Sequence, residues 1–315
     1  MSLFKKISIL LVVMLVVSYF IPAQSTQKVT IKKPFYAVVT EINNPDSWRK
    51  WYAPIQSSYQ KHPHNYRYTQ DYKNKTSTIY THNNTFVITK YSPGLITIDE
   101  SLLFKTQRGL NIAFTKTGDC VAMETCSTSL LGYLFNFFTP DEQKTSIIKA
   151  LKKFIETPAL YYGFEIKKTK VPDTLYIMLS KTVGIKHRFK VTDSLFKLLT
   201  QYAFKNKLTT VFKPYLVASC IGKDSVQLTT MLVIDKPDTQ YSKIQTFTMP
   251  SVGNILVTHY KGPYGDAKAV YEGMQKYVSD NNFSGVFTPF EKYLNKQIPK
   301  NDSSIIDMEV YYPIY

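Results

Sequence analysis

The sequence predicts an α+β protein made of two consecutive domains. Its 315 residues exceed the usual length of a single domain. Hydrophobic residues make up 44% of the chain and charged residues 20%, which suits packed cores rather than disorder. Tyrosine and phenylalanine occur 24 and 19 times, and these side chains favour strands. Short alternating segments broken by a few amphipathic stretches indicate antiparallel sheets with helices packed on them.

Charge and motif content narrow the classes of function. The net charge of +16 would attract anions, but the basic residues form no dense block, so a solvated basic surface is the simpler interpretation. Between residues 23 and 160 there is no helix-turn-helix pattern and no basic recognition helix, so nucleic acid is not an expected partner. The 3 cysteines and 5 histidines show no zinc spacing, and no phosphate-binding loop occurs. We therefore expect neither a metal nor a cofactor.

An apolar run lies at the N-terminus. Lys5 and Lys6 precede it, and it extends from Ile7 to Ile21. The pattern predicts a membrane anchor within residues 1–24, with the bilayer as partner through residues 7–22 and the rest of the chain outside the cytoplasm. Cleavage of a signal peptide near Ala23, giving a secreted protein, is the alternative. Outside the cytoplasm Cys120 and Cys126 could form a disulfide, although two buried thiols fit equally well.

The first domain is expected over residues 25–160. Val29-Thr30-Ile31 alternates as a strand, and Asn44-Pro45-Asp46 forms a turn or helix start before Trp48 and Trp51. Between them a short helix is indicated by four apolar residues at helical spacing, namely Phe35, Val38, Val39 and Ile42. Alternating segments then predict a meander of strands at 76–80, 85–91, 95–103, 110–116 and 121–127.

A long helix is predicted to close this domain. Thr139 has the position of an N-cap, Pro140 follows at the first helical position, and Glu142 completes a capping box. The helix presents an apolar stripe of Ile147, Ile148, Leu151, Phe154 and Ile155. Thr157-Pro158 then ends it.

This order of elements resembles the START-like, polyketide-cyclase-like helix-grip superfamily (SRPBCC). The residues that carry the resemblance are Ile31, Pro34, Phe35, Val39, Ile42 and the segment 44–51. The resemblance implies a helix-grip antiparallel sheet around a long C-terminal helix, with an apolar cavity between them and no fixed catalytic set. Trp48 and Trp51 are then candidates for ligand contact, with a packed lid over the core as the alternative.

The second domain, residues 161–315, contains an internal repeat. Val211-Phe212-Lys213-Pro214-Tyr215 returns as Val286-Phe287-Thr288-Pro289-Phe290. In each copy a strand, at 175–181 or 255–261, leads to an amphipathic helix, and two further strands follow the repeated motif. The duplicated unit is therefore strand, helix, strand, strand, and ligands favour the groove between two such halves.

The second half resembles the gyrase-inhibitor-like (GyrI-like) effector-binding domain, a duplicated β-α-β-β fold of the SHS2 type with a central groove. The matching residues are His259, Gly262-Pro263-Tyr264, Tyr271, Pro289-Phe290-Glu291-Lys292-Tyr293, Pro299 and Glu309-Val310-Tyr311-Tyr312-Pro313. The resemblance implies an aromatic groove with a buried glutamate that binds bulky, often cationic or aromatic molecules. Some members of the family resemble hydrolases that act on strained cyclopropyl compounds.

The carried-over ligand-binding residues are Glu309, Glu291, Tyr293, Tyr311, Tyr264 and Tyr271. Strand alternation places Glu309 with Tyr311 and Glu291 with Tyr293. We expect Glu309 to face the groove with the other three nearby, where a desolvated carboxylate and aromatic faces attract a cation. A solvated strand glutamate is the alternative for either acid. Val233 occupies the position equivalent to Glu309 in the first half, so the acidic site is one-sided.

Three functions remain open from the sequence. The leading hypothesis is a membrane-anchored protein that binds amphipathic or cationic aromatic molecules in the groove, and that could hold an apolar ligand in the helix-grip cavity. The second is a hydrolase in which Glu309 or Glu291 activates water. The third is a non-catalytic structural protein of the envelope. Binding is favoured over catalysis because the sequence shows no partnered nucleophile.

Overall fold

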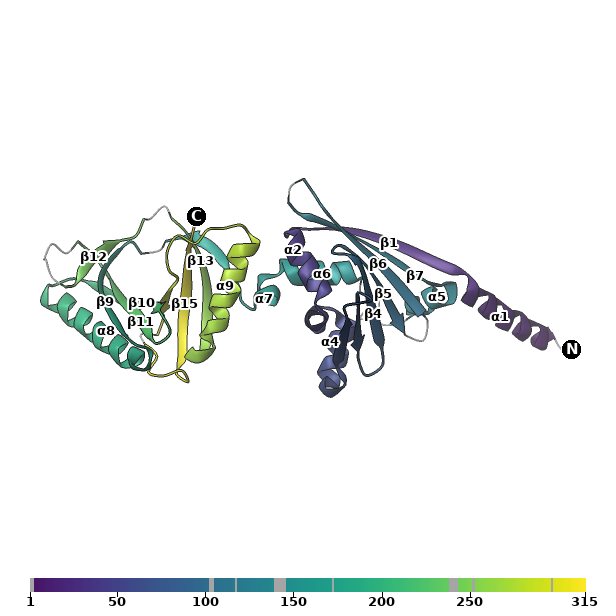
Figure 1. Ribbon diagram of the computed structural model, residues 1–315, viewed down its shortest axis with the longest axis horizontal. Coiled ribbons are helices and arrows are strands. Elements are labelled where there is room, and N and C mark those ends of the chain that lie inside the picture. Colours follow the sequence, from purple (N-terminus) through teal and green to yellow (C-terminus); the bar gives the residue numbers. More distant parts are fainter. Residues whose placement is uncertain are drawn as a thin grey trace. The chain divides into compact units, whose positions relative to one another are not determined.

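The protein divides into two compact units, each an antiparallel sheet with helices. The computed structural model describes residues 3–101, 105–116, 118–138, 146–171, 173–237, 243–250, 253–295 and 297–315. Unit 1 is Met1–Thr157 and unit 2 is Pro158–Tyr315. Figure 1 shows the elements of each unit. The predicted α+β class is confirmed.

Unit 1 is built on a seven-stranded sheet in the order β1-β7-β6-β5-β4-β3-β2. The strands are β1 Pro22–Ile31, β2 Arg67–Asp71, β3 Thr76–Tyr80, β4 Thr85–Ser92, β5 Leu95–Ser101, β6 Lys105–Phe114 and β7 Cys120–Ser129. Strands β3 to β7 form the predicted meander, β2 pairs with β3 at one edge, and β1 pairs along the whole of β7 at the other. Strand β2 was not predicted, because its exposed polar residues show no apolar alternation.

The helices of unit 1 follow the apolar spacing of the sequence. They are α2 Phe35–Asn43, α3 Trp48–Trp51, α4 Ala53–Lys61, α5 Leu130–Phe138 and α6 Ile147–Glu156, with short 3₁₀ turns at Pro45–Ser47 and Pro63–Asn65. All five residues of the predicted stripe on α6 are buried. The Ser146 hydroxyl caps α6 by accepting from the Lys149 amide at 3.4 Å. The predicted cap at Thr139, Pro140 and Glu142 lies outside the described residues.

The N-terminal membrane anchor predicted from the apolar run is wrong. Leu3–Phe20 form helix α1, but no helix in the described part of the chain is long and apolar enough to cross a bilayer. At 1.5 Å per residue, 18 residues extend for about 27 Å, whereas a hydrocarbon core measures ~30 Å. Lys5 and Lys6 occupy the first turns of α1, and the chain continues as β1 from Pro22 (Figure 1). The bilayer partner at residues 7–22 and the location outside the cytoplasm, which rested on the anchor, are withdrawn with it.

The three cysteines are free. Cys120 and Cys126 belong to the same strand, β7, and are separated by about 20 Å at ~3.3 Å per residue. This distance is far beyond the span of a disulfide. The alternative of a Cys120–Cys126 disulfide is therefore excluded.

Unit 2 is built on an eight-stranded sheet in the order β12-β9-β11-β10-β14-β15-β13-β8. The strands are β8 Lys167–Lys170, β9 Leu175–Gly184, β10 Thr210–Ile221, β11 Ser225–Ile234, β12 Gln245–Thr248, β13 Asn254–Pro263, β14 Phe290–Tyr293 and β15 Ile305–Ile314. The helices are α7 Pro158–Tyr161, α8 Arg188–Lys205 and α9 Lys268–Asp280, with 3₁₀ turns η4 Ile185–His187 and η5 Tyr264–Ala267.

The predicted duplication is confirmed in unit 2. The first copy is β9-α8-β10-β11 and the second is β13-α9-β14-β15. Helix α8 packs on β9 and β11, and α9 packs on β13 and β15. The two copies join where β10 pairs with β14, at the centre of the sheet. The short strand β14 is therefore the seam between the repeats.

Candidate functional site

A buried carboxylate surrounded by tyrosines lies in unit 2. Glu291 on β14 is only 3% exposed. Three phenolic hydroxyls donate hydrogen bonds to it: Tyr271 to Oε1 at 2.7 Å, Tyr264 to both oxygens at 3.1 and 3.3 Å, and Tyr293 to Oε2. We call Tyr264, Tyr271 and Tyr293 the tyrosine cage. Sequence reasoning had named all four residues.

The cage is assembled from three neighbouring elements. Glu291 and Tyr293 are two residues apart on β14, so their side chains lie on one face of the sheet. Tyr264 comes from η5, and Tyr271 comes from α9, which covers that face. The first copy of the repeat contributes Phe189, at the start of α8, whose ring meets the Tyr264 ring edge-on at 5.8 Å between centroids.

The carboxyl group of the cage has no ion-pair partner within the described residues. Burial raises the pKa of Glu291, and the hydrogen bonds from the three tyrosines only partly oppose this effect. The pKa values of the tyrosines rise well above the ordinary value, through burial first and then through the Glu291 charge, so they stay neutral donors. No basic residue in the described ranges forms an ion pair with Glu291.

Glu309 lies on the other face of the sheet, which corrects the expectation that it shares a groove with Glu291. In the register of β14 with β15, Lys292 lies opposite Glu309 and Glu291 lies opposite Val310. The Tyr311 hydroxyl donates to Glu309 at 2.5 Å, so the alternation within each strand is confirmed. Alternation within a strand does not give the register of that strand with its neighbour. For this reason the sequence did not show that Glu309 and Glu291 lie on opposite faces.

The reverse face of unit 2 is already neutralised. Lys292 is 7% exposed, and its ammonium lies 3.1 Å from the Asp173 carboxylate. The ammonium also lies over the rings of Tyr215 and Tyr311, at 5.2 and 5.8 Å from their centroids. Tyr215 donates to Asp173. This face therefore supplies its own cation, in contrast to the cage.

Trp48 and Trp51 are part of the core of unit 1. They are 0% and 6% exposed, and their ring centroids are 4.8 Å apart. The Trp48 indole N–H donates to the Ile42 carbonyl at 2.9 Å, and that of Trp51 donates to the Ser47 hydroxyl at 3.4 Å. Since both donors are satisfied within the chain, the structure favours the packed lid over ligand contact.

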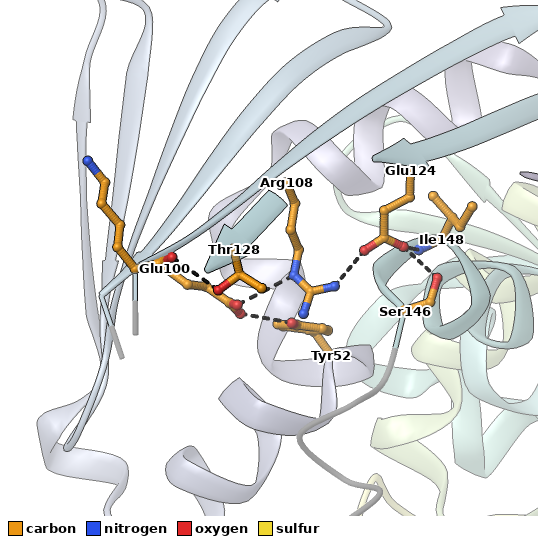
Figure 2. Close-up of polar contacts among 8 residues, drawn as sticks. Tyr52, Glu100, Arg108, Glu124, Thr128, Ser146 and Ile148 are labelled. Atoms are coloured by element: carbon orange, nitrogen blue, oxygen red, sulfur yellow. Dashed lines mark hydrogen bonds and ion pairs between the residues drawn. The ribbon is translucent and has the colours of Figure 1, made fainter. Parts of the chain in front are cut away.

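Sequence reasoning missed a charged network inside unit 1. Figure 2 shows Arg108 on β6 between Glu100 on β5 and Glu124 on β7. Arg108 Nη1 lies 2.7 Å from Glu124 Oε1, and Nε lies 3.4 Å from Glu100 Oε2. The Tyr52 hydroxyl donates to Glu100 at 2.9 Å. Glu124 also accepts from the Ser146 hydroxyl at 2.5 Å and from the Ile148 amide at 3.3 Å.

Strand register brings these charges together. Ile98 pairs with Arg108, and Arg108 pairs with Cys126, so each glutamate lies diagonally across from the guanidinium. Burial acts to lower the pKa of Arg108, but Tyr52, Glu100 and Glu124 outweigh it and the pKa is raised. The signal in the sequence was a single charge at the inward position of an alternating strand, such as Glu100 after Ile96 and Ile98.

Each unit also contains a cavity. One, of about 350 Å³, lies against α8 in unit 2, where Phe196, Thr200 and Pro214 are among its lining residues. The other, of about 230 Å³, lies beside α4 in unit 1 and has Glu100 in its wall. Among the residues that line these two cavities, Glu100 is the one that belongs to a cluster described above.

Comparison with known proteins gives fold similarities only. No family model matches the chain, and no curated protein matches it in sequence. The EcmrR C-terminal domain is 17% identical, covers 48% of this chain and 98% of its own, and has a TM-score of 0.40. SAV2435 bound to tetraphenylphosphonium is 12% identical to this chain. The match covers 48% of this chain and 94% of SAV2435, with a TM-score of 0.29.

The di-domain ARO/CYC protein BexL from the BE-7585A biosynthetic pathway matches across both units. It is 9% identical, covers 93% of this chain and 85% of its own, and has a TM-score of 0.33. At such identities and TM-scores, none of these similarities bears on activity. The class that the fold itself defines is an α+β protein with a helix-grip sheet followed by a duplicated β-α-β-β unit.

Proposed function

We propose that unit 2 binds organic cations in the tyrosine cage, with the Glu291 carboxylate as the counter-charge. The observation that carries this proposal is that Glu291, 3% exposed, is met by phenolic donors alone. A buried carboxylate is costly when no cation pairs with it. A bound cation supplies the missing charge.

The surroundings of the cage favour a cation that carries apolar or aromatic groups. Tyrosine and phenylalanine faces attract cations and also shield them from water. Phe189 adds an aromatic face next to Tyr264 for the apolar body of such a ligand. On the reverse face of the sheet a lysine of the protein itself, Lys292, supplies the cation.

The other functions have less support. A catalytic glutamate must hold a water molecule, yet both oxygens of Glu291 already accept from tyrosines. An apolar ligand in unit 1 is disfavoured because the described interior there carries the network of Figure 2. If the titration described below shows no binding of the cation, the third hypothesis, a structural protein without a ligand, is favoured.

The test is calorimetric titration of the full chain with tetraphenylphosphonium. Glu291→Gln keeps the shape of the side chain but removes its charge. Two unit charges about 6–10 Å apart attract each other by roughly 2–3 kcal/mol at an effective dielectric constant of ~20, so we expect binding to weaken by about this amount. Glu309→Gln is the matched control on the same sheet, and it should leave the affinity unchanged because Glu309 lies on the reverse face.

A neutral probe of similar size, triphenylphosphine oxide, tests whether charge matters. It should bind more weakly than the cation and should respond little to Glu291→Gln. Equal binding of the cation by the wild type and by a correctly folded Glu291→Gln variant would show that the cage is not the cation site.

A further inference from the structure

The cavity beside α4 in unit 1 is built almost entirely from polar side chains. It measures about 230 Å³, below the ~300 Å³ at which drug-sized pockets begin, so it suits a small ligand. Hydroxyl and amide groups dominate its wall, including those of Ser57, Ser58 and Asn83. Glu100 and Lys61 are its acidic and basic members, and His62 also lines it.

Glu100 is the less satisfied carboxylate of the buried network. Arg108 approaches Glu124 at 2.7 Å but Glu100 only at 3.4 Å. Glu124 also receives a hydroxyl and an amide donor, whereas the neutral Tyr52 phenol is the other partner of Glu100 within the described residues. Two carboxylates share one guanidinium, so one negative charge remains, and the distances place it on Glu100.

The wall of the cavity carries charges of both signs, Glu100 and Lys61. Glu100, which is 3% exposed, calls for a hydrogen-bonding cation such as an ammonium group. Lys61, the last residue of α4, is exposed and lines the same cavity. A simple amine would be repelled by the Lys61 ammonium, while a ligand with a carboxylate would pair with it.

We infer that unit 1 binds a small zwitterion of the amino-acid class, with its ammonium group on Glu100 and its carboxylate toward Lys61. Ser57, Ser58 and Asn83 then offer hydrogen bonds to a polar side chain. This site is separate from the tyrosine cage in both unit and ligand: the cage takes a bulky cation, and this cavity takes a compact molecule without net charge.

Titration of the full chain with l-serine and l-glutamine tests the inference. Ethanolamine and 4-aminobutanamide, which lack the carboxylate, and glutaramic acid, which lacks the ammonium group, are the matched probes. We expect at least one of the two amino acids to bind, and its analogues to bind about tenfold or more weakly, the scale of one charged hydrogen bond.

Two variants locate the site. Glu100→Gln and Lys61→Ala should each weaken amino-acid binding about tenfold or more. Asp99→Asn is the matched control, because Asp99 precedes Glu100 on β5 and points to the other face of the sheet. Lys61 is exposed, so its variant retains the fold even if Glu100→Gln does not.

Three results would overturn the inference. The first is that neither amino acid binds at millimolar concentration. The second is that an amine analogue binds as tightly as its parent amino acid. The third is that Lys61→Ala and Asp99→Asn give the same affinity as the wild type.

Discussion

The two units bury glutamates in different electrostatic surroundings. In unit 1 the guanidinium of Arg108 lies between Glu100 and Glu124. In unit 2 Glu291 meets three phenols. A phenol donates a hydrogen bond but adds no charge, whereas a guanidinium does both. The comparison teaches that burial alone does not decide how much negative charge a carboxylate leaves for a ligand: the number of cations among its partners decides it, none for Glu291 and one shared by Glu100 and Glu124.

The largest expected effect comes from removing the cation of unit 1. Arg108→Met leaves two carboxylates buried side by side, so the free energy of unfolding should fall by about 3–5 kcal/mol. Both tryptophans, Trp48 and Trp51, lie in unit 1, so tryptophan fluorescence during urea unfolding reports on this unit.

Arg67→Met is the control for this experiment. Arg67 is exposed and lies over the Tyr80 ring at 4.6 Å, so its removal should cost only about 0.5–1 kcal/mol. Similar losses for the two variants would mean that Arg108 does not stabilise unit 1 through its charge.

A smaller effect is expected from removing one donor of the cage. Tyr271→Phe deletes the hydrogen bond of 2.7 Å to Glu291 and leaves a buried acceptor less satisfied. Unit 2 should lose roughly 1–3 kcal/mol, measured by circular dichroism during unfolding. Tyr312→Phe serves as the control and should stay within about 0.5 kcal/mol, because no hydrogen bond of the Tyr312 hydroxyl occurs within the described residues. Equal losses would show that the phenol of Tyr271 adds nothing specific.

The smallest effect concerns pH. Burial raises the pKa of Glu291 above its ordinary value of 4.5, so the folded protein holds this proton more tightly than the unfolded chain does. The resulting stability is present below pH 4.5 and is lost as the pH rises through the raised pKa. In Glu291→Gln this decline should be absent. Parallel pH profiles of unfolding for the two proteins would contradict the raised pKa.

Binding of a cation should show the opposite trend with pH. The ionised carboxylate is the form that binds, so affinity for tetraphenylphosphonium should rise over the same range in the wild type. Glu291→Gln should give a flat profile. If the affinity of the wild type does not change with pH, the cage is not the cation-binding site.

The sequence was sufficient for elements whose pattern is local. Strand β3 begins and ends where alternation placed it, at Thr76 and Tyr80, and the duplicated unit followed from the repeat at 211–215 and 286–290. The four residues of the Glu291 cluster were named through the family resemblance. Local periodicity and a recurrent motif depend on neighbours in the chain, which the sequence displays directly.

Relations between strands were not predictable in the same way. Glu309 was expected beside Glu291, but the register of β14 with β15 separates them by the thickness of the sheet. The network of Arg108 was missed because Glu100, Arg108 and Glu124 come from three strands, each of which contributes one charge to it. Register depends on the pairing partner, and one residue of shift changes the face of every side chain.

The duplication in unit 2 fixes the orientation of any ligand that binds where the two copies meet. Leu216 follows Pro214-Tyr215 as Glu291 follows Pro289-Phe290, and the register places Leu216 directly opposite Glu291. The two copies have therefore diverged at the position where they meet: one offers an alkyl group and the other a carboxylate. A cation bound across this pair of residues would turn its charged end to Glu291 in the second copy and its apolar end to Leu216 in the first. The proposed cage therefore takes one cation per unit 2, although the architecture of this unit is twofold.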